Sequence, residues 1–174
     1  MATDSPPSRF RLKHLILGHA RTIAGTVYGT IAVMAVLAAA ARSYEHMLWR
    51  LVALTSVTAV VLWLAHVYAH GVGESLQLGR RLTPAEFTSV ARREYSIVLA
   101  AVPPVAAIAL GAIGIVPHDT AVALSLAVGT ATLGAQGLRY ARLERLSFTG
   151  SLLTVMLNLA IGLALVAAEV FIAH

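Results

Sequence analysis

The chain has 174 residues, of which 58% are apolar and only 12% are charged, and its formal net charge is +5. A soluble domain is usually about 45–50% apolar and about 25% charged, so this composition excludes an ordinary water-soluble globule, and lipid must cover the apolar surface that a domain of this size cannot bury. The absence of cysteine excludes disulfides, zinc–thiolate sites, iron–sulfur clusters and cysteine nucleophiles.

Residues 1–22 are predicted to form a cytoplasmic tail ahead of the first membrane span. Basic and apolar side chains are mixed in the stretch 9–21, as in the run from Arg9 to Lys13. Such a mixture is typical of a short interfacial helix that lies on the anionic inner leaflet. The alternative is a plain charged flank of the first span.

Five stretches that follow the tail are long and apolar enough to cross a bilayer, which takes roughly 20 mostly apolar residues. The fourth is the least apolar, because Ser125, Thr130, Thr132 and Gln136 dilute it. A helix satisfies its own backbone hydrogen bonds in lipid, so we predict an all-α fold, a polytopic transmembrane helical bundle that occupies residues 23–174 as one domain. The predicted spans are 23–41, 48–69, 95–116, 121–138 and 150–173.

The positions of the basic residues predict the orientation of these spans. If the N-terminus is inside, 11 of the 13 lysine and arginine residues lie on the inner side, and only Arg42 and Arg50 lie outside. Basic residues near the ends of spans favour the cytoplasmic side. We therefore predict a multi-pass bacterial cell (plasma) membrane protein with its N-terminus inside and its C-terminus outside.

The inner loop between the second and third spans carries the signature of a helix start. Thr83 is a good cap, Pro84 suits the first helical position, and Glu86 stands three residues after the cap, as in a capping box. A short helix that begins at Pro84 and leads into the third span is therefore predicted.

A group of titratable residues ends the second span. His66, His70 and Glu74 are spaced four apart, so a continuous helix would place them on one face. Gly71 and Gly73 weaken the helix between His70 and Glu74, which would move the carboxylate out of line. Two imidazoles and a carboxylate could relay protons or bind a divalent cation, so His66, His70 and Glu74 are also the candidate metal ligands.

His19 before the first span and Glu94 before the third are expected at a similar depth in the cytoplasmic leaflet. The candidate ion or proton site therefore comprises His19, His66, His70, Glu74 and Glu94. Polar residues at membrane depth are costly and often functional. However, aromatic and titratable side chains also gather at membrane interfaces as anchors or in ordinary packing, and that interpretation carries the most weight.

Two further features concern the shape of the helices. Pro103 and Pro104 predict a kink or break in the third span that frees carbonyls near residues 99 and 100. We favour a kink that shapes helix packing over one that forms a binding site. Gly25 and Gly29 have the four-residue spacing that lets helices approach closely, and we favour contact within the chain over dimerisation. Glycines 129, 134, 137 and 162 resemble the same device.

The sequence carries no phosphate-binding loop, no His-Glu-x-x-His, no Gly-x-Ser-x-Gly and no paired carboxylates within a span. We therefore expect a protein that is not an enzyme and needs no cofactor. Membrane orientation explains the excess of basic residues, so no nucleic acid is expected as a partner. The expected partners are the lipid bilayer and either further copies of the chain or another membrane protein.

Two stretches, Arg21 to Ala35 and Trp63 to His70, resemble small polytopic actinobacterial integral membrane proteins of unassigned function, and the resemblance implies no substrate. There is also a similarity to the bacterial lysosomal-type potassium channel family, which pairs an arginine-led first helix with a second helix ending in Trp and His. That family's Phe-Ser-Asp signature is replaced by the residues from Ile23 to Thr26, so no pore residues are carried over.

Two functional hypotheses follow. In the first, the chain is a channel or transporter component that handles protons or cations through the His and Glu cluster of the inner leaflet. In the second, it is a non-catalytic membrane protein that binds a partner protein or lipid. A metal-dependent membrane oxidoreductase is a third, less favoured interpretation.

Overall fold

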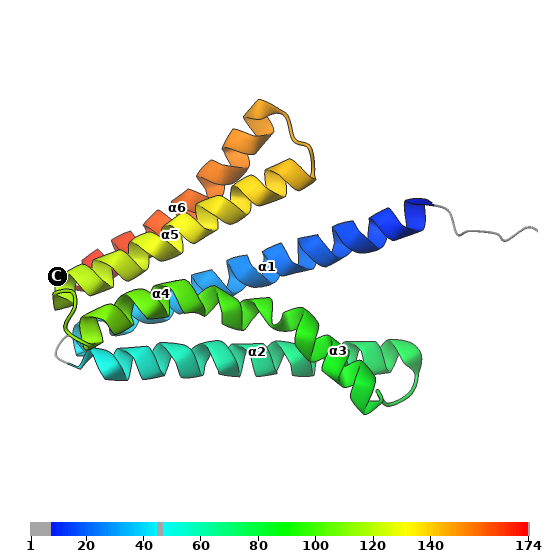
Figure 1. The fold of residues 1–174 in the computed structure, drawn as a ribbon, viewed down its shortest axis with the longest axis horizontal. Coiled ribbons are helices and arrows are strands. Elements are labelled where there is room, and N and C mark those ends of the chain that lie inside the picture. The colour runs from blue at the N-terminus through cyan, green and yellow to red at the C-terminus, as the bar shows by residue number, and fades with distance from the viewer. Residues whose placement is uncertain (1–7, 45–46, 174) are drawn as a thin grey trace, which may run out of the picture.

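The computed structural model describes the backbone of residues 8–44 and 47–173 and the side chains of residues 22–44, 47–167 and 171. Helices follow one another in the order α1 (Ser8–Ala40), the 3-10 turn η1 (Arg42–Tyr44), α2 (Leu48–Leu78), α3 (Pro84–Glu94), α4 (Ser96–Ala112), α5 (His118–Leu143) and α6 (Phe148–Ala173) (Figure 1). The described ranges contain no strand. The prediction of an all-α fold is confirmed.

Five helical segments of the described chain are long and apolar enough to cross a membrane, as the sequence predicted. They are Thr22–Ala40, Leu48–Leu78, Pro84–Ala112, His118–Leu143 and Phe148–Ala167. The fourth is again the least apolar of the five. Length and composition thus identify the chain as a multi-pass membrane protein.

The helix bounds differ from the predicted spans most at the first three spans. α1 is one continuous helix from Ser8 to Ala40, with no interruption between the stretch 9–21 and the first span. α2 continues past residue 69 to Leu78, where Gly79 ends it in the left-handed conformation with φ 63°. The third segment begins in α3, and the helix is interrupted at Tyr95, where Figure 1 shows the chain bending.

Successive helices run up and down, so the turns gather at two ends of the bundle (Figure 1). We call one of them the arginine-rich end. It holds the start of α1, the α2–α3 turn and the α5–α6 loop, with the arginines at positions 80, 81, 92, 93, 139, 142 and 145. The opposite end holds η1 and the α4–α5 turn, with Arg42 and Arg50. The basic residues are therefore segregated along the length of the molecule.

α1 lies at the centre of the bundle and packs against α2, α4, α5 and α6. Its residues Val33, Met34 and Leu37 are fully buried and meet Leu51 of α2 and Leu133 of α5 in one apolar cluster. Burying such side chains contributes about 1.5–3 kcal/mol each in water. In lipid that driving force is weak, and close packing takes its place.

Glycines permit this close packing at the helix contacts. A β-carbon at Gly29 would lie 2.6 Å from the carbonyl oxygen of Ile97 in α4, and one at Gly129 of α5 would lie 2.6 Å from the Met34 sulfur of α1. Gly25 also faces α4, where it meets Ser96. Gly25 and Gly29 therefore serve a contact within the chain.

α4 stays helical through Pro103 and Pro104. Of the kink or break that the prolines predict, a break is not found here, and the helix is interrupted at Tyr95 instead. Each proline leaves one carbonyl without its helical donor, but a break would free more backbone groups in hydrocarbon, where they are costly. Pro103 is exposed and Pro104 is buried, and the Ser125 hydroxyl of α5 donates to the Pro104 carbonyl at 2.8 Å.

α6 is the least covered helix of the bundle. It packs mainly on α5, and its outer face exposes Phe148, Leu153 and Leu157. A contiguous apolar face of this kind is unfavourable in water. It is the surface that acyl chains cover in a membrane.

Candidate functional site

The predicted ion or proton site lines a cavity of about 300 Å³ between α1, α2 and the junction of α3 with α4. Four of the five predicted residues contribute to its wall: His66, His70, Glu74 and Glu94. The fifth, His19, lies outside the residues whose side chains the structure describes. The remaining wall residues are Ala24, Gly25, Tyr28 and Ile97. We call this space the histidine cavity.

The regular spacing along α2 brings three of these side chains to the cavity. His66, His70 and Glu74 follow one another at intervals of one helical turn, and α2 continues through Gly71 and Gly73 to Leu78. Glu74 therefore stays in line with the histidines. Gly71 is the place where Phe87 of α3 comes close, since an added β-carbon would lie 3.5 Å from its ring.

Backbone contacts orient both imidazole rings. The Nδ1 atom of His66 lies 3.0 Å from the Leu62 carbonyl oxygen, and that of His70 lies 3.0 Å from the His66 carbonyl oxygen. A carbonyl only accepts hydrogen bonds, so these contacts are hydrogen bonds when Nδ1 carries the proton. In that tautomer Nε2 keeps the lone pair, and it is the atom of each ring that can take up a proton or a cation.

Tyr28 connects α1 to the histidines. Its ring centroid lies 4.6 Å from that of His66, and the His66 and His70 rings lie 6.2 Å apart. The three rings form a row from α1 to α2. The Tyr28 and His66 rings are tilted by 49° to each other, so Tyr28 packs beside the imidazole and holds α1 against this part of α2.

Glu94 is the least exposed carboxylate of the cavity. Its side chain is 15% exposed, against 56% for that of His70, and its Oε1 lies 3.6 Å from the His70 Nδ1. A buried carboxylate needs a cation or hydrogen-bond donors. Among the described residues His70 is its only ion-pair partner, so a proton on His70 would neutralise this corner of the cavity.

Glu74 has a different electrostatic role, because it forms an ion pair with Arg93 of α3. Both side chains are about one-third exposed, so solvent screens the pair. Arg93 leaves Glu74 with its charge balanced. The groups that still lack a fixed opposite charge are thus His66, His70 and Glu94.

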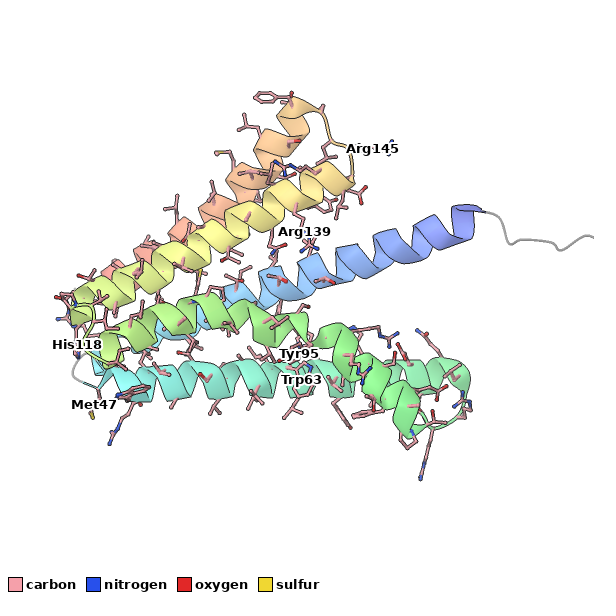
Figure 2. The ribbon with its side chains drawn as sticks, in the orientation of Figure 1. Met47, Trp63, Tyr95, His118, Arg139 and Arg145 are labelled. Carbon is pink, nitrogen blue, oxygen red and sulfur yellow. The ribbon has the colours of Figure 1, made fainter. Side chains whose placement is uncertain are left out.

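Trp63 fixes α3 against α2 next to the cavity. Its indole Nε1 donates to the Ala91 carbonyl at 3.0 Å, and its ring meets that of Tyr95 edge-on at 6.5 Å (Figure 2). Trp63 precedes His66 by one turn, and Ala91 precedes Glu94 by one turn. The clamp therefore sets the distance between the histidines and Glu94.

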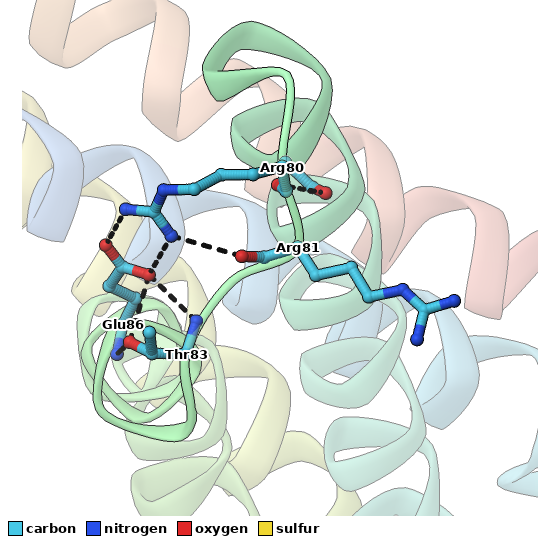
Figure 3. Close-up of polar contacts among 5 residues, drawn as sticks. Arg80, Arg81, Thr83 and Glu86 are labelled. Atoms are coloured by element: carbon cyan, nitrogen blue, oxygen red, sulfur yellow. Dashed lines mark hydrogen bonds and ion pairs between the residues drawn. The ribbon is translucent and has the colours of Figure 1, made fainter.

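The α2–α3 turn is held by a network around Glu86 (Figure 3). Its carboxylate accepts two hydrogen bonds from Arg80, at 3.0 and 2.8 Å, and one from the Thr83 backbone at 2.8 Å. The Thr83 hydroxyl accepts from the Glu86 backbone at 3.3 Å, which completes the predicted capping box. Hydrogen bonding to Glu86 and its negative charge raise the pKa of Arg80, so the guanidinium stays charged.

Two polar residues at or beside the cavity were absent from the predicted site: Tyr28, which lines its wall, and Arg93, which pairs with Glu74. Tyr28 lies between Gly25 and Gly29 in the sequence, and Arg93 is one of the basic residues that predict the orientation of the spans. Among the described residues, no three His, Asp or Glu side chains are grouped so that they could hold a metal ion. Pro103 and Pro104 do not reach the cavity, whereas Gly25 forms part of its wall.

Comparison with known proteins found no matching family model, no matching curated protein and no matching solved structure.

Proposed function

We propose that the chain is a component of a membrane channel or transporter that takes up protons or small cations at the histidine cavity. The observation that carries this proposal is the convergence of His66, His70 and Glu94 on one cavity, beside a Glu74 that Arg93 already neutralises. A carboxylate beside imidazole nitrogens offers ligands to a cation, and imidazole is the side chain that most readily exchanges protons in the physiological range.

The position of the cavity along α2 supports an entrance and not a mid-membrane site. Twenty helical residues cross about 30 Å of hydrocarbon, and α2 begins at Leu48. Counted from there, His66 lies near the far boundary of the hydrocarbon. His70 and Glu74 lie one and two helical turns beyond His66. Protons or cations would therefore reach the cavity from the water at the arginine-rich end.

The proposal extends to orientation. Seven arginines of the described chain lie at the arginine-rich end, against Arg42 and Arg50 at the other. The positive-inside rule assigns the more basic end to the cytoplasm. The cavity would then exchange protons or cations with the cytoplasm of the cell.

Flux through reconstituted protein tests this function. Liposomes that contain the full chain and a trapped pH-sensitive dye are given a membrane potential, and proton entry is followed by the dye. Sodium-sensitive and potassium-sensitive dyes measure the entry of these cations in the same way. His70→Gln and Glu94→Gln each remove one partner of the same charged contact, so we expect flux to fall about tenfold in either variant.

The matched controls are His118→Gln and Glu144→Gln, which make the same chemical changes at exposed positions outside the cavity (His118 is labelled in Figure 2). Their flux should equal that of the unmodified chain. Full flux in a His66→Gln, His70→Gln double variant, or no flux above empty liposomes for the unmodified chain, would refute the proposal.

A further inference from the structure

A second cavity lies on the other side of α1, between that helix and the α5–α6 hairpin. Its volume is about 500 Å³, within the range of about 300–1,000 Å³ that small-molecule sites occupy. The residues of α1 that line it include Ile23, Val27 and Ile31, and the opposite wall holds Gln136 and Thr154. Most of this wall is apolar, so water or a free anion fills it poorly. We call this space the α1–α5 groove.

The polar residues of the α1–α5 groove lie toward the arginine-rich end. Gln136 and Tyr140 stand one turn apart on α5, and Asn158 faces them from α6, where its Nδ2 donates to the Thr154 carbonyl at 2.9 Å. The Oε1 atom of Gln136 is buried and has no hydrogen-bond partner among the described residues. A buried polar atom ordinarily finds a partner, so the side chains that the structure describes do not complete this lining by themselves.

A positive charge stands at the mouth of the groove. Arg139 follows Gln136 by three residues and therefore lies on the same side of α5, and Figure 2 shows its side chain in the space between α5 and α1. Within the described part of the chain Arg139 has no ion pair. Arg142 and Arg145 continue the basic character toward the α5–α6 loop.

The depth of these groups matches that of a phospholipid. From His118 to Arg139, α5 rises about 32 Å, close to the thickness of the hydrocarbon layer, so Arg139 reaches the level of the phosphates. Gln136 lies about 4.5 Å deeper, at the level of the hydrated ester groups of the lipid. Ester carbonyls accept hydrogen bonds from the amide NH2, and bound water donates to the amide oxygen. The apolar wall continues from there into the hydrocarbon.

We propose that the α1–α5 groove binds an anionic phospholipid of the leaflet at the arginine-rich end. Arg139 contacts the phosphate, Gln136 contacts the ester region, and one acyl chain occupies the space beside Val27 and Ile31. The site is separate from the histidine cavity, because Arg139 and Gln136 line no part of that cavity. Tyr28 and Ala24 line both spaces, so a bound lipid would touch the residue whose ring contacts that of His66.

Lipid binding to the purified full chain tests this proposal. Native mass spectrometry of the protein in mild detergent is used to titrate phosphatidylglycerol and phosphatidylcholine that carry the same acyl chains. We expect phosphatidylglycerol to bind at least about five- to tenfold more tightly, and Arg139→Gln to remove this preference while Arg139→Lys keeps most of it, since one arginine near an anionic surface has about this effect.

The matched control is Arg81→Gln, which removes an exposed charge from the same end of the bundle but far from the groove in sequence, in the α2–α3 turn. It should leave the preference for phosphatidylglycerol unchanged. Equal binding of both lipids, or equal losses in Arg81→Gln and Arg139→Gln, would overturn the proposal. Equal competition by chain-free glycerophosphoglycerol would overturn it as well, because the site would then bind the headgroup alone.

Discussion

Gly29 marks a close approach between α1 and α4, and its missing side chain determines how near the two helices lie. The carbonyl oxygen of Ile97 and the β-carbon of Ala100 occupy the positions that a larger residue would need. Ile97 also lines the histidine cavity. The glycine therefore influences both the stability of the bundle and the shape of the cavity.

Gly29→Ala should destabilise the fold by about 1–3 kcal/mol, because overpacking in a tight contact forces backbone shifts. Gly73→Ala is the matched control: it makes the same change within a helix, but nothing lies within 4 Å of the added carbon. Alanine favours a helix over glycine by about 0.5–1 kcal/mol, so Gly73→Ala should stabilise. Thermal melts in detergent compare the two, and equal shifts would contradict the packing described for α1 and α4.

The chemistry of the cavity depends on two residues that local sequence patterns do not reveal. The spacing of His66, His70 and Glu74 is visible in the sequence because a helix repeats every 3.6 residues. The pairing of Arg93 with Glu74 and the contact between the Tyr28 and His66 rings depend on how α3 and α1 dock on α2. Such docking is a tertiary property, and no periodicity reports it.

Among the elements, α2 shows best how helix and membrane span differ. Its 31 residues correspond to about 46 Å, well beyond the roughly 30 Å of hydrocarbon. The predicted span ends at residue 69, because polar residues follow it in the sequence, but the helix continues to Leu78. The part beyond the span is what presents His70 and Glu74 to α3.

The hairpin of α2 and α3 depends on the cap at Thr83, and a substitution there tests it. Thr83→Ala should cost about 1 kcal/mol, the usual effect of losing a helix cap. Hydrogen exchange of the α3 amides should become faster by the corresponding factor of about five. The hydroxyl–backbone contact of the capping box is lost in this variant, while the Arg80–Glu86 ion pair remains.

Thr88→Ala is the control for that experiment, because Thr88 also lies in α3 but its hydroxyl donates only to the Pro84 carbonyl within the helix. Alanine is the better helix former there, so exchange should be unchanged or slower. If both threonine variants accelerate exchange alike, the capping box does not hold the turn.

The third segment shows a physical reason for the place where its helix is interrupted. The two prolines predicted a kink or break at Pro103 and Pro104; α4 passes through both without a break, and the interruption lies at Tyr95 beside Glu94. Breaking a helix in hydrocarbon exposes backbone groups that find no water. Near the arginine-rich end water is available, so the chain bends there at lower cost.

At the scale of the whole molecule, the five membrane-spanning segments and the segregation of arginine were predictable, because hydropathy and charge are local properties of the chain. The two cavities on opposite sides of α1 were not, because they depend on the angles at which the helices pack. α1 stands between the histidine cavity and the α1–α5 groove, and Tyr28 lines both. Protons or cations and lipids would thus meet the same central helix.

The central claim is that the histidine cavity opens at a single arginine-rich face, which we propose is the cytoplasmic one. Because the chain has no native cysteine, Arg81→Cys, Glu144→Cys and His118→Cys each introduce a unique site for an impermeant maleimide. We predict that residues 81 and 144 are labelled only in inverted vesicles and residue 118 only in intact cells. Labelling of residues 81 and 144 from opposite faces of the membrane would contradict the account.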